Sequence, residues 1–221
     1  MGWKKVETSK RPFEVIFLID TSYSMKDNKI QSVNSTMSKL EKALKALAKN
    51  WPTVQYNIRI ITFGGDKAKW HTGDENSAYP IENFQYDKIE DSELGGGTPL
   101  GDAIGLLCKI FENPNFSDRN FIPLISIISD GKPTDMRAVE SNLKKLLANQ
   151  WGEYALKTAV AIGDADRDLL VKFTGKPDMV KSATNAAKIV DDIIWFSSSI
   201  VKDNKGLPDP DSRVLGGVKN E

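Results

Sequence analysis

Short apolar runs alternate along the chain with longer segments in which apolar residues recur every three or four positions. The runs at residues 15–19, 54–63, 122–129 and 155–162 are typical of strands in a buried parallel sheet. The spacing of three and four predicts amphipathic helices, the longest of which carries Ile30, Val33, Met37, Leu40, Leu44 and Leu47. Because strands and helices alternate, we expect an α/β fold with a central, mostly parallel sheet, right-handed crossovers and helices on both faces.

The segment after the second predicted strand departs from this alternation. Gly64 and Gly65 precede a further strand at residues 67–72, which predicts an antiparallel hairpin at one edge of the sheet. Residues 73–97 then show little periodicity, and a connection of that length is often a functional loop. The aromatic residues of this region either form a surface for a partner or pack the loop against the domain; they are Trp70, His71, Tyr79, Phe84 and Tyr86.

Composition narrows the function mainly by exclusion. Among the 221 residues, 30 Lys and Arg balance 30 Asp and Glu, so no net charge attracts nucleic acid or an anionic membrane surface. No apolar run approaches the roughly 18 residues of a transmembrane helix, and the polar start lacks the apolar stretch of a signal peptide. Cys108 is the only cysteine, which excludes an intrachain disulfide and favours a cytoplasmic protein.

The length suits one domain with short polar ends. Hydrophobic residues make up 40% of the chain and charged residues 27%, which is enough apolar surface for a core. We expect a polar N-terminal extension at residues 1–12, a single domain at residues 13–201 and a flexible tail at residues 202–221. The tail contains Pro208, Pro210 and three glycines but few large apolar residues.

Two carboxylates follow directly after apolar strands, and this placement is the first indication of a site. Asp20 ends the run at residues 15–19, and Asp130 ends the run at residues 122–129. Ligands of open α/β sheets bind beyond the carboxyl ends of the strands. Two carboxylates brought together there repel each other unless one is protonated or a cation lies between them. A hard divalent cation resolves this conflict.

The residues around these carboxylates add further oxygen ligands. In an extended turn alternate residues point the same way, so Asp20, Ser22 and Ser24 can share one face. The glycine-rich loop at residues 95–101 contributes the hydroxyl of Thr98, which otherwise caps the helix that follows. Oxygen-only ligands suit Mg²⁺, with Mn²⁺ or Ca²⁺ as alternatives, and suit zinc or copper poorly.

Three separated motifs, in this order, resemble the von Willebrand factor type A domain and its metal-ion-dependent adhesion site. The family's DxSxS motif matches Asp20, Ser22 and Ser24, its single loop threonine matches Thr98, and its Asp-Gly pair matches Asp130 and Gly131. The resemblance covers residues 13–201. It implies a Rossmann-like fold whose five motif side chains hold a divalent ion, through which the Asp or Glu of a partner protein is bound without catalysis.

Within this family, the residues of these motifs are most similar to those of bacterial TerY-type proteins of tellurium-resistance and chemical-stress operons. That closer resemblance implies a cytoplasmic stress-response scaffold that works beside a kinase or a phosphatase encoded nearby. Tyr23 stands where such proteins commonly carry glycine. The departure leaves the ligands of the first motif intact but changes the rim of the site.

Other functions fit the same residues less well. An aspartate after the first parallel strand is also where haloacid-dehalogenase-like phosphatases carry their nucleophile, so a metal-dependent hydrolase using Asp20 is one alternative. Their second acid, two residues later, is Ser22 here. A phosphate-binding loop requires Lys and Ser or Thr after its last glycine, whereas Gly101 is followed by Asp102. The remaining alternative is an interaction domain whose metal is only structural and whose partner contacts residues 73–97.

Overall fold

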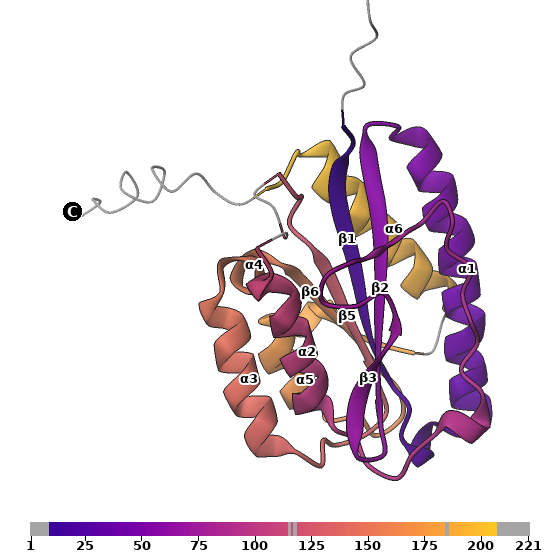
Figure 1. Ribbon diagram of the computed structural model, residues 1–221. Helices are drawn as coiled ribbons and strands as arrows, with labels where there is room; N and C mark the ends of the chain where they lie inside the picture. The colour runs from indigo at the N-terminus through magenta and orange to yellow at the C-terminus, as the bar shows by residue number, and fades with distance from the viewer. Residues whose placement is uncertain (1–8, 115, 117–118, 184–185, 207–221) are drawn as a thin grey trace, which may run out of the picture.

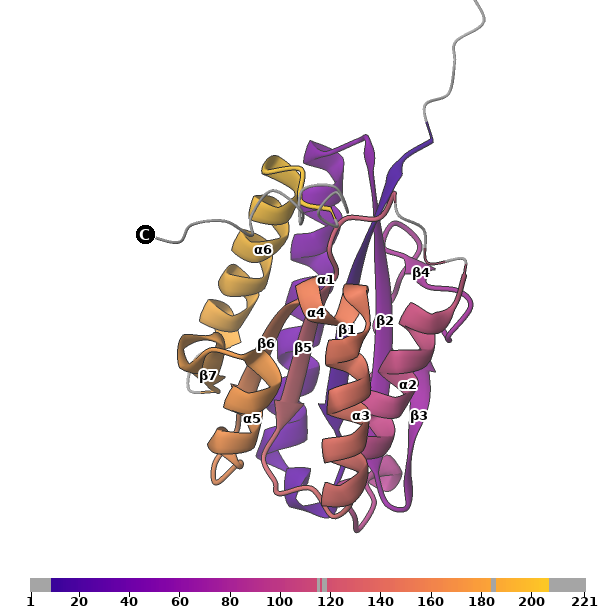
Figure 2. The same ribbon diagram turned by 90° about the vertical axis from the view of Figure 1, so that its left-hand side faces the viewer.

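The computed structural model describes residues 9–114, 116, 119–183 and 186–206, in which a seven-stranded sheet lies between two layers of helices (Figures 1 and 2). The strands are β1 (Arg11–Asp20), β2 (Val54–Gly64), β3 (Lys67–Thr72), β4 (Tyr79–Pro80), β5 (Leu124–Ser129), β6 (Leu156–Ala161) and β7 (Val180–Ser182). The α-helices are α1 (Asn28–Asn50), α2 (Leu100–Glu112), α3 (Met136–Ala148), α4 (Gln150–Tyr154), α5 (Arg167–Thr174) and α6 (Ala186–Lys202). Short 3-10 helices occupy Tyr23–Met25, Asp91–Glu93 and Pro177–Met179.

The sheet order is β3-β2-β1-β5-β6-β7, with β4 paired to β2. Strands β2, β1, β5, β6 and β7 run parallel, whereas β3 and β4 run antiparallel to β2. The predicted α/β fold, with a mostly parallel sheet and an antiparallel edge strand, is therefore confirmed. The structure adds β4, β7 and α4, which are too short to show a periodic pattern of apolar residues.

Strand β1 lies at the centre of the sheet and supplies both faces of the core. Its odd-numbered residues from Phe13 to Ile19 pack with α1 and α6, and its even-numbered Ile16 and Leu18 pack with α2, α3, α4 and α5. Figure 2 shows these two helical layers on opposite sides of the sheet. All six apolar residues predicted to line α1 are buried. The alternation of side chains along one central strand thus explains the two layers.

The long connection at residues 73–97 packs against the domain rather than standing away from it. Phe84 and Tyr86 are buried in the core beside α1, while Tyr79 remains 44% exposed. The buried amide of Asn34, on α1, donates to the Ile89 carbonyl at 2.9 Å and accepts from the Ile89 N–H at 3.1 Å. Its oxygen also accepts from the Tyr86 hydroxyl at 2.9 Å. One side chain therefore ties this connection to α1.

Two further observations concern the single cysteine and the search for a membrane-spanning helix. The single thiol, Cys108, is buried in α2, and burial raises the pKa of that thiol to about 11. Within the ranges that the structure describes, no helix is both long and apolar enough to cross a membrane. Of the extension predicted at residues 1–12, residues 1–8 lie outside the described residues and β1 begins at Arg11; of the tail predicted at residues 202–221, residues 207–221 lie outside them and α6 ends at Lys202.

Candidate metal centre

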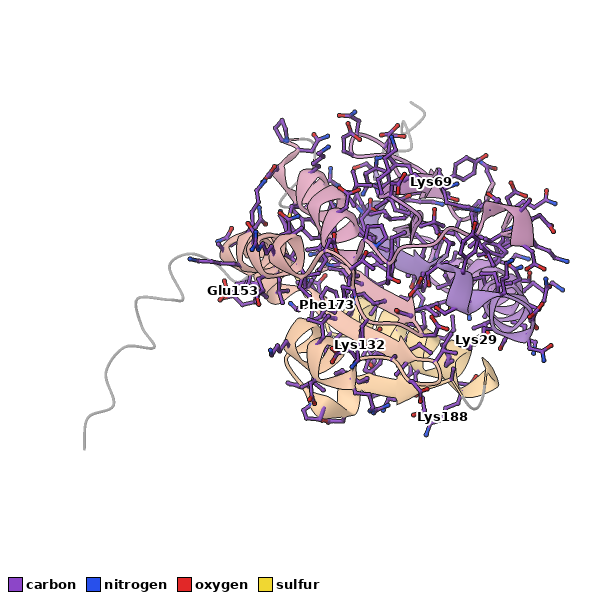
Figure 3. All side chains as sticks on the ribbon, turned by 90° about the horizontal axis from the view of Figure 1, so that it is seen from below. Lys29, Lys69, Lys132, Glu153, Phe173 and Lys188 are labelled. Carbon is purple, nitrogen blue, oxygen red and sulfur yellow. The ribbon has the colours of Figure 1, made fainter. Side chains whose placement is uncertain are left out.

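The carboxyl ends of β1 and β5 lie next to each other at one edge of the sheet. The two strands pair in parallel, with Ile19 opposite Ile128, so Asp20 and the residue after β5, Asp130, leave the sheet side by side. Figure 3 looks onto this edge, where Lys29 and Lys132 are labelled. The topology thus brings together the two carboxylates that the sequence placed at strand ends.

Asp20 is fully buried, and both of its carboxylate oxygens accept a hydrogen bond. The Ser22 N–H donates to Oδ1 at 2.8 Å, and the Ser129 hydroxyl donates to Oδ2 at 2.6 Å. Burial raises the pKa of Asp20 above its ordinary value; the hydrogen bonds from Ser129 and Ser22 oppose this rise, and the charge of Asp130 adds to it. The carboxylate is therefore fixed in direction, and a cation beside it would favour its charged form.

The first motif reaches Asp130 through a chain of hydroxyl groups. Ser22 Oγ and Ser24 Oγ lie 2.9 Å apart, and Ser24 Oγ donates to Asp130 Oδ1 at 2.7 Å. The 3-10 helix Tyr23–Met25 turns the chain directly after Ser22, and this turn brings the second serine toward β5. The second Asp130 oxygen accepts from the Lys29 ammonium. The DxSxS motif and Asp130 are thus one connected group.

Thr98, in the glycine-rich loop at residues 95–101, brings its hydroxyl group close to Asp20 and Gly131. A methyl group built on Gly131 would lie 3.4 Å from Thr98 Oγ1 and 3.8 Å from Asp20 Oδ2, so both oxygens border this glycine. Thr98 is buried, and its hydroxyl has no hydrogen-bond partner among the described residues. Its backbone is held instead, because its carbonyl accepts from the Thr134 N–H at 3.0 Å. Because the Thr98 hydroxyl oxygen is not enclosed away from solvent, it is open to a ligand that approaches from the edge of the sheet.

The loop that carries Thr98 crosses the β2–β3 turn at a contact between backbones. A methyl group on Gly95 would lie 2.4 Å from the nitrogen of Gly65, and one on Gly97 would lie 2.3 Å from the oxygen of Gly65. The Gly95 N–H also donates to the Thr21 carbonyl at 2.8 Å. Only glycine permits this approach. The glycines therefore position Thr98 rather than forming a phosphate-binding loop.

The start of α2 is capped by another residue than Thr98. Thr98 does not cap α2, because Pro99 occupies the cap position. Asp135 occupies the N-cap position of α3, but its carboxylate accepts from the N–H groups of Gly101 and Asp102 at 3.0 and 2.9 Å. It therefore compensates the unpaired N–H groups at the start of α2. This leaves the Thr98 hydroxyl available to the site.

The donor set fits a hard divalent cation. The five predicted ligands converge at one edge of the sheet, where Ser24 is exposed and the other four are buried, and they offer only carboxylate and hydroxyl oxygens. In the part of the chain that the structure describes, no three His, Cys, Asp or Glu side chains gather into a group that could hold a metal ion, so an ion at this site would depend on the hydroxyl ligands as well. Asp20, Ser22, Ser24, Thr98 and Asp130 therefore remain the predicted ligands, and Mg²⁺, Mn²⁺ or Ca²⁺ the predicted ions.

Two residues of this site were missed from sequence. Ser129 donates to Asp20 and accepts from the Gly131 N–H at 3.2 Å, so it aligns the first carboxylate with the turn after β5. Lys29 pairs with Asp130 from the first turn of α1. A serine inside an apolar strand and a lysine near a helix start are both common, so neither carries a signal of its own. Their contacts depend on how β1, β5 and α1 meet.

The comparisons with known proteins agree with this architecture. Inter-alpha-trypsin inhibitor heavy chain H4 of Homo sapiens is 25% identical over 156 residues, and that of Sus scrofa is 25% identical over 154 residues. Each match covers 66% of this chain, but only 16% and 15% of the length of the relative. The chain therefore corresponds to a small part of these larger proteins.

Solved structures show the same fold at low identity. Pilus adhesin SpaC of Lactobacillus rhamnosus GG, in its open conformation, aligns with a TM-score of 0.64 at 13% identity, over 87% of this chain and 30% of the adhesin chain. Proximal thread matrix protein 1 of the mussel byssus, with a zinc-occupied MIDAS motif, aligns with a TM-score of 0.55 at 16% identity, over 89% of this chain and 47% of that chain. The family model of the von Willebrand factor type A domain matches residues 14–194. Because this match spans most of the chain, the protein belongs to the von Willebrand factor type A domain family.

Proposed function

We propose that this chain is a divalent-metal-dependent protein-binding module. Asp20, Ser22, Ser24, Thr98 and Asp130 would hold Mg²⁺, or Mn²⁺ or Ca²⁺, and the Asp or Glu of a partner protein would complete the coordination. The observation that carries the proposal is the Thr98 hydroxyl, which has no hydrogen-bond partner among the described residues and borders the same glycine as Asp20. The group around it offers oxygen ligands from three distant segments.

The balance of charge supports binding through the ion. Three of the five predicted ligands are neutral hydroxyls, so a bound divalent ion would keep positive character toward an incoming carboxylate. Hydrogen bonds within the chain already orient the ligands: both carboxylate oxygens of Asp20 accept one, and the Ser24 hydroxyl donates one to Asp130. A site arranged in advance loses little conformational entropy when the ion and the partner bind.

The biological setting belongs to the same proposal. The motif spellings support a bacterial, cytoplasmic stress-response scaffold of the TerY type, with a kinase or phosphatase of the same operon as partner. We also propose that the chain is not an enzyme. A hydrolase using Asp20 is the second candidate, but both oxygens of that carboxylate accept hydrogen bonds, and Ser22 stands where such enzymes carry their second acid.

Affinity capture tests the proposed function. We expect the immobilised chain to retain a protein from native extract in Mg²⁺ and to release it in EDTA, because the ion joins the two carboxylate-bearing surfaces. Mass spectrometry of the eluate identifies the partner, and a kinase or phosphatase there supports the TerY-type setting. An Asp20→Ala variant that captures the same protein equally, or capture that withstands EDTA, would refute binding through the ion. Turnover of a phosphoester would favour the hydrolase.

Lys29 allows a more specific test of the ion site, because its ammonium group pairs with one carboxylate oxygen of the predicted ligand Asp130. The Lys29 side chain is 40% exposed, so its pairing with Asp130 is worth no more than about 1 kcal/mol. We expect Lys29→Met to lower the dissociation constant for Mg²⁺ by about two- to fivefold, measured by isothermal titration calorimetry.

The control is Lys26→Met, which also removes one positive charge from this edge of the sheet. The Lys26 ammonium lies over the Tyr23 ring, 5.0 Å from its centroid, and makes no ion pair with Asp130. We expect this variant to bind Mg²⁺ nearly as the unmodified chain does. Equal changes in both variants would mean that Lys29 acts through general electrostatics and does not compete for Asp130.

A further inference from the structure

The opposite end of β1 carries a second buried polar group, separate from the metal centre. Glu14 lies six residues before Asp20, about 20 Å away along an extended strand. Its Oε2 accepts from the Arg59 guanidinium, on β2, at 2.7 Å, and its Oε1 accepts from the Asn57 amide at 3.2 Å. The Glu14 and Arg59 side chains are each only 5% exposed. This ion pair is therefore almost fully withdrawn from water.

The ion pair borders a cavity of about 210 Å³. Beside Glu14, Asn57 and Arg59, its polar lining includes Glu75 and Asn120. Phe116 and Ile110 give part of the wall an apolar character. The connection after β3 closes one side, because the Arg59 Nε–H donates to the Asp74 carbonyl at 2.9 Å. The cavity is smaller than the sites of drug-sized ligands, which measure roughly 300–1,000 Å³.

Several polar groups that line this cavity have no hydrogen-bond partner within the described chain. Arg59 uses its Nε–H and one N–H of Nη1, which leaves three of its five donors without a hydrogen bond. Asn120 is only 4% exposed, yet its side-chain amide makes no hydrogen bond to the described residues. The oxygen of the Asn57 amide likewise accepts none. Both donors and acceptors are thus available to one small molecule.

Stability alone does not account for this arrangement. A buried ion pair pays a desolvation cost comparable to its electrostatic gain, and well-packed apolar residues often replace such pairs without loss. Burial raises the pKa of Glu14, against the lowering effect of Arg59, which reflects the same cost. The unpaired donors of Arg59 and Asn120 are not enclosed away from solvent, so a ligand in the cavity can reach them. A ligand that contacts these groups would offset the cost.

We propose that this cavity binds a zwitterionic α-amino acid with a small apolar side chain. The free N–H groups of Arg59 and Asn120 would receive its carboxylate, since a guanidinium matches a carboxylate in both charge and shape. Glu75 and the Asn57 oxygen would accept from its ammonium group. Ile110 and Phe116 would contact its side chain. Two carboxylates, Glu14 and Glu75, line the cavity beside one guanidinium, which disfavours a dianion such as phosphate.

Titration of the full chain with L-valine tests this proposal, and EDTA keeps it independent of the metal centre. We expect saturable binding by isothermal titration calorimetry, together with shifts of the Asn120 side-chain amide and Arg59 Nε signals in ¹⁵N-correlated NMR spectra. L-valinamide lacks the carboxylate and N-acetyl-L-valine lacks the ammonium group, and each is expected to bind at least about tenfold more weakly. Glycerol is the probe for an uncharged polyol.

Asn120→Ala removes an unpartnered amide and breaks no hydrogen bond of that side chain, so the fold is expected to survive. It should weaken L-valine binding by at least about tenfold. The control is Asn83→Ala, at an exposed asparagine outside the cavity, which should bind unchanged. No saturable binding of any amino acid, equal binding of glycerol, or equal binding by Asn120→Ala would overturn the proposal.

Discussion

Replacing Asp130 with alanine should abolish the binding of Mg²⁺ while the fold survives. The Asp130 side chain is fully buried and is one of only two carboxylates in the predicted ligand set. Without it, one carboxylate and three hydroxyls remain, which is too little negative charge to dehydrate the ion. At a Mg²⁺ concentration of 100 times the dissociation constant, the unmodified chain should gain about 2.7 kcal/mol of unfolding free energy, and the variant should gain none. Thermal unfolding with and without Mg²⁺, together with calorimetric titration, measures both effects.

The same variant separates a ligand-binding ion from a structural one. In the absence of metal, we expect the unfolding free energy to change by less than about 1 kcal/mol, because Lys29 is partly exposed and regains water. The control is Asp178→Ala, at an exposed aspartate remote from the site, which should retain the full effect of Mg²⁺. If Asp130→Ala unfolds, the ion is part of the fold. If it captures the partner normally, the partner is held elsewhere.

Replacing Asn34 with alanine should destabilise the protein more than any other polar substitution proposed here. The change removes three hydrogen bonds and leaves the N–H and the carbonyl of Ile89 buried without partners. Each unsatisfied buried group costs about 1–3 kcal/mol, so we expect a total loss of about 2–4 kcal/mol. Urea unfolding followed by circular dichroism measures the loss. Faster hydrogen exchange at the Ile89 amide would show that residues 73–97 are loosened locally.

The matched control is Ser35→Ala, one position further along α1 but on its exposed side. Its unfolding free energy should stay within about 0.5 kcal/mol of the unmodified chain. An Asn34→Ala variant that is equally stable would show that the connection is held by its apolar residues alone. The contacts of Phe84 and Ile89 with the core would then be sufficient.

The long elements and the two carboxylates at strand ends were predictable, because burial and helical spacing leave strong local patterns. The run at residues 15–19 lies inside β1, and residues 67–72 match β3. Strand β7 has three residues and β4 has two, one of them Pro80, so neither forms a pattern. Their existence depends on pairing with β6 and β2.

The hydrogen-bond and ion-pair partners at these sites could not be predicted from the sequence, because they depend on strand register and on contacts between distant segments. Glu14 directly precedes the apolar run at residues 15–19, but its ion pair with Arg59 requires the parallel register of β1 and β2. Asn34 lies on the buried side of α1, and its amide finds its hydrogen-bond partners only because residues 73–97 pass beside it. Residue type alone could not show either partner.

The contact between the Thr98 loop and the β2–β3 turn has a consequence for how variants of this protein are interpreted. A methyl group on Gly64 would lie 2.2 Å from the Thr21 carbonyl oxygen, and one on Gly97 would lie 2.3 Å from the Gly65 oxygen. Neither change alters charge, polarity or a predicted ligand, yet each would force the backbone beside the site to move. An alanine scan restricted to side chains that bear donors or charges would pass over these positions. The residues that determine where the ion is held therefore include several that have no side chain to remove.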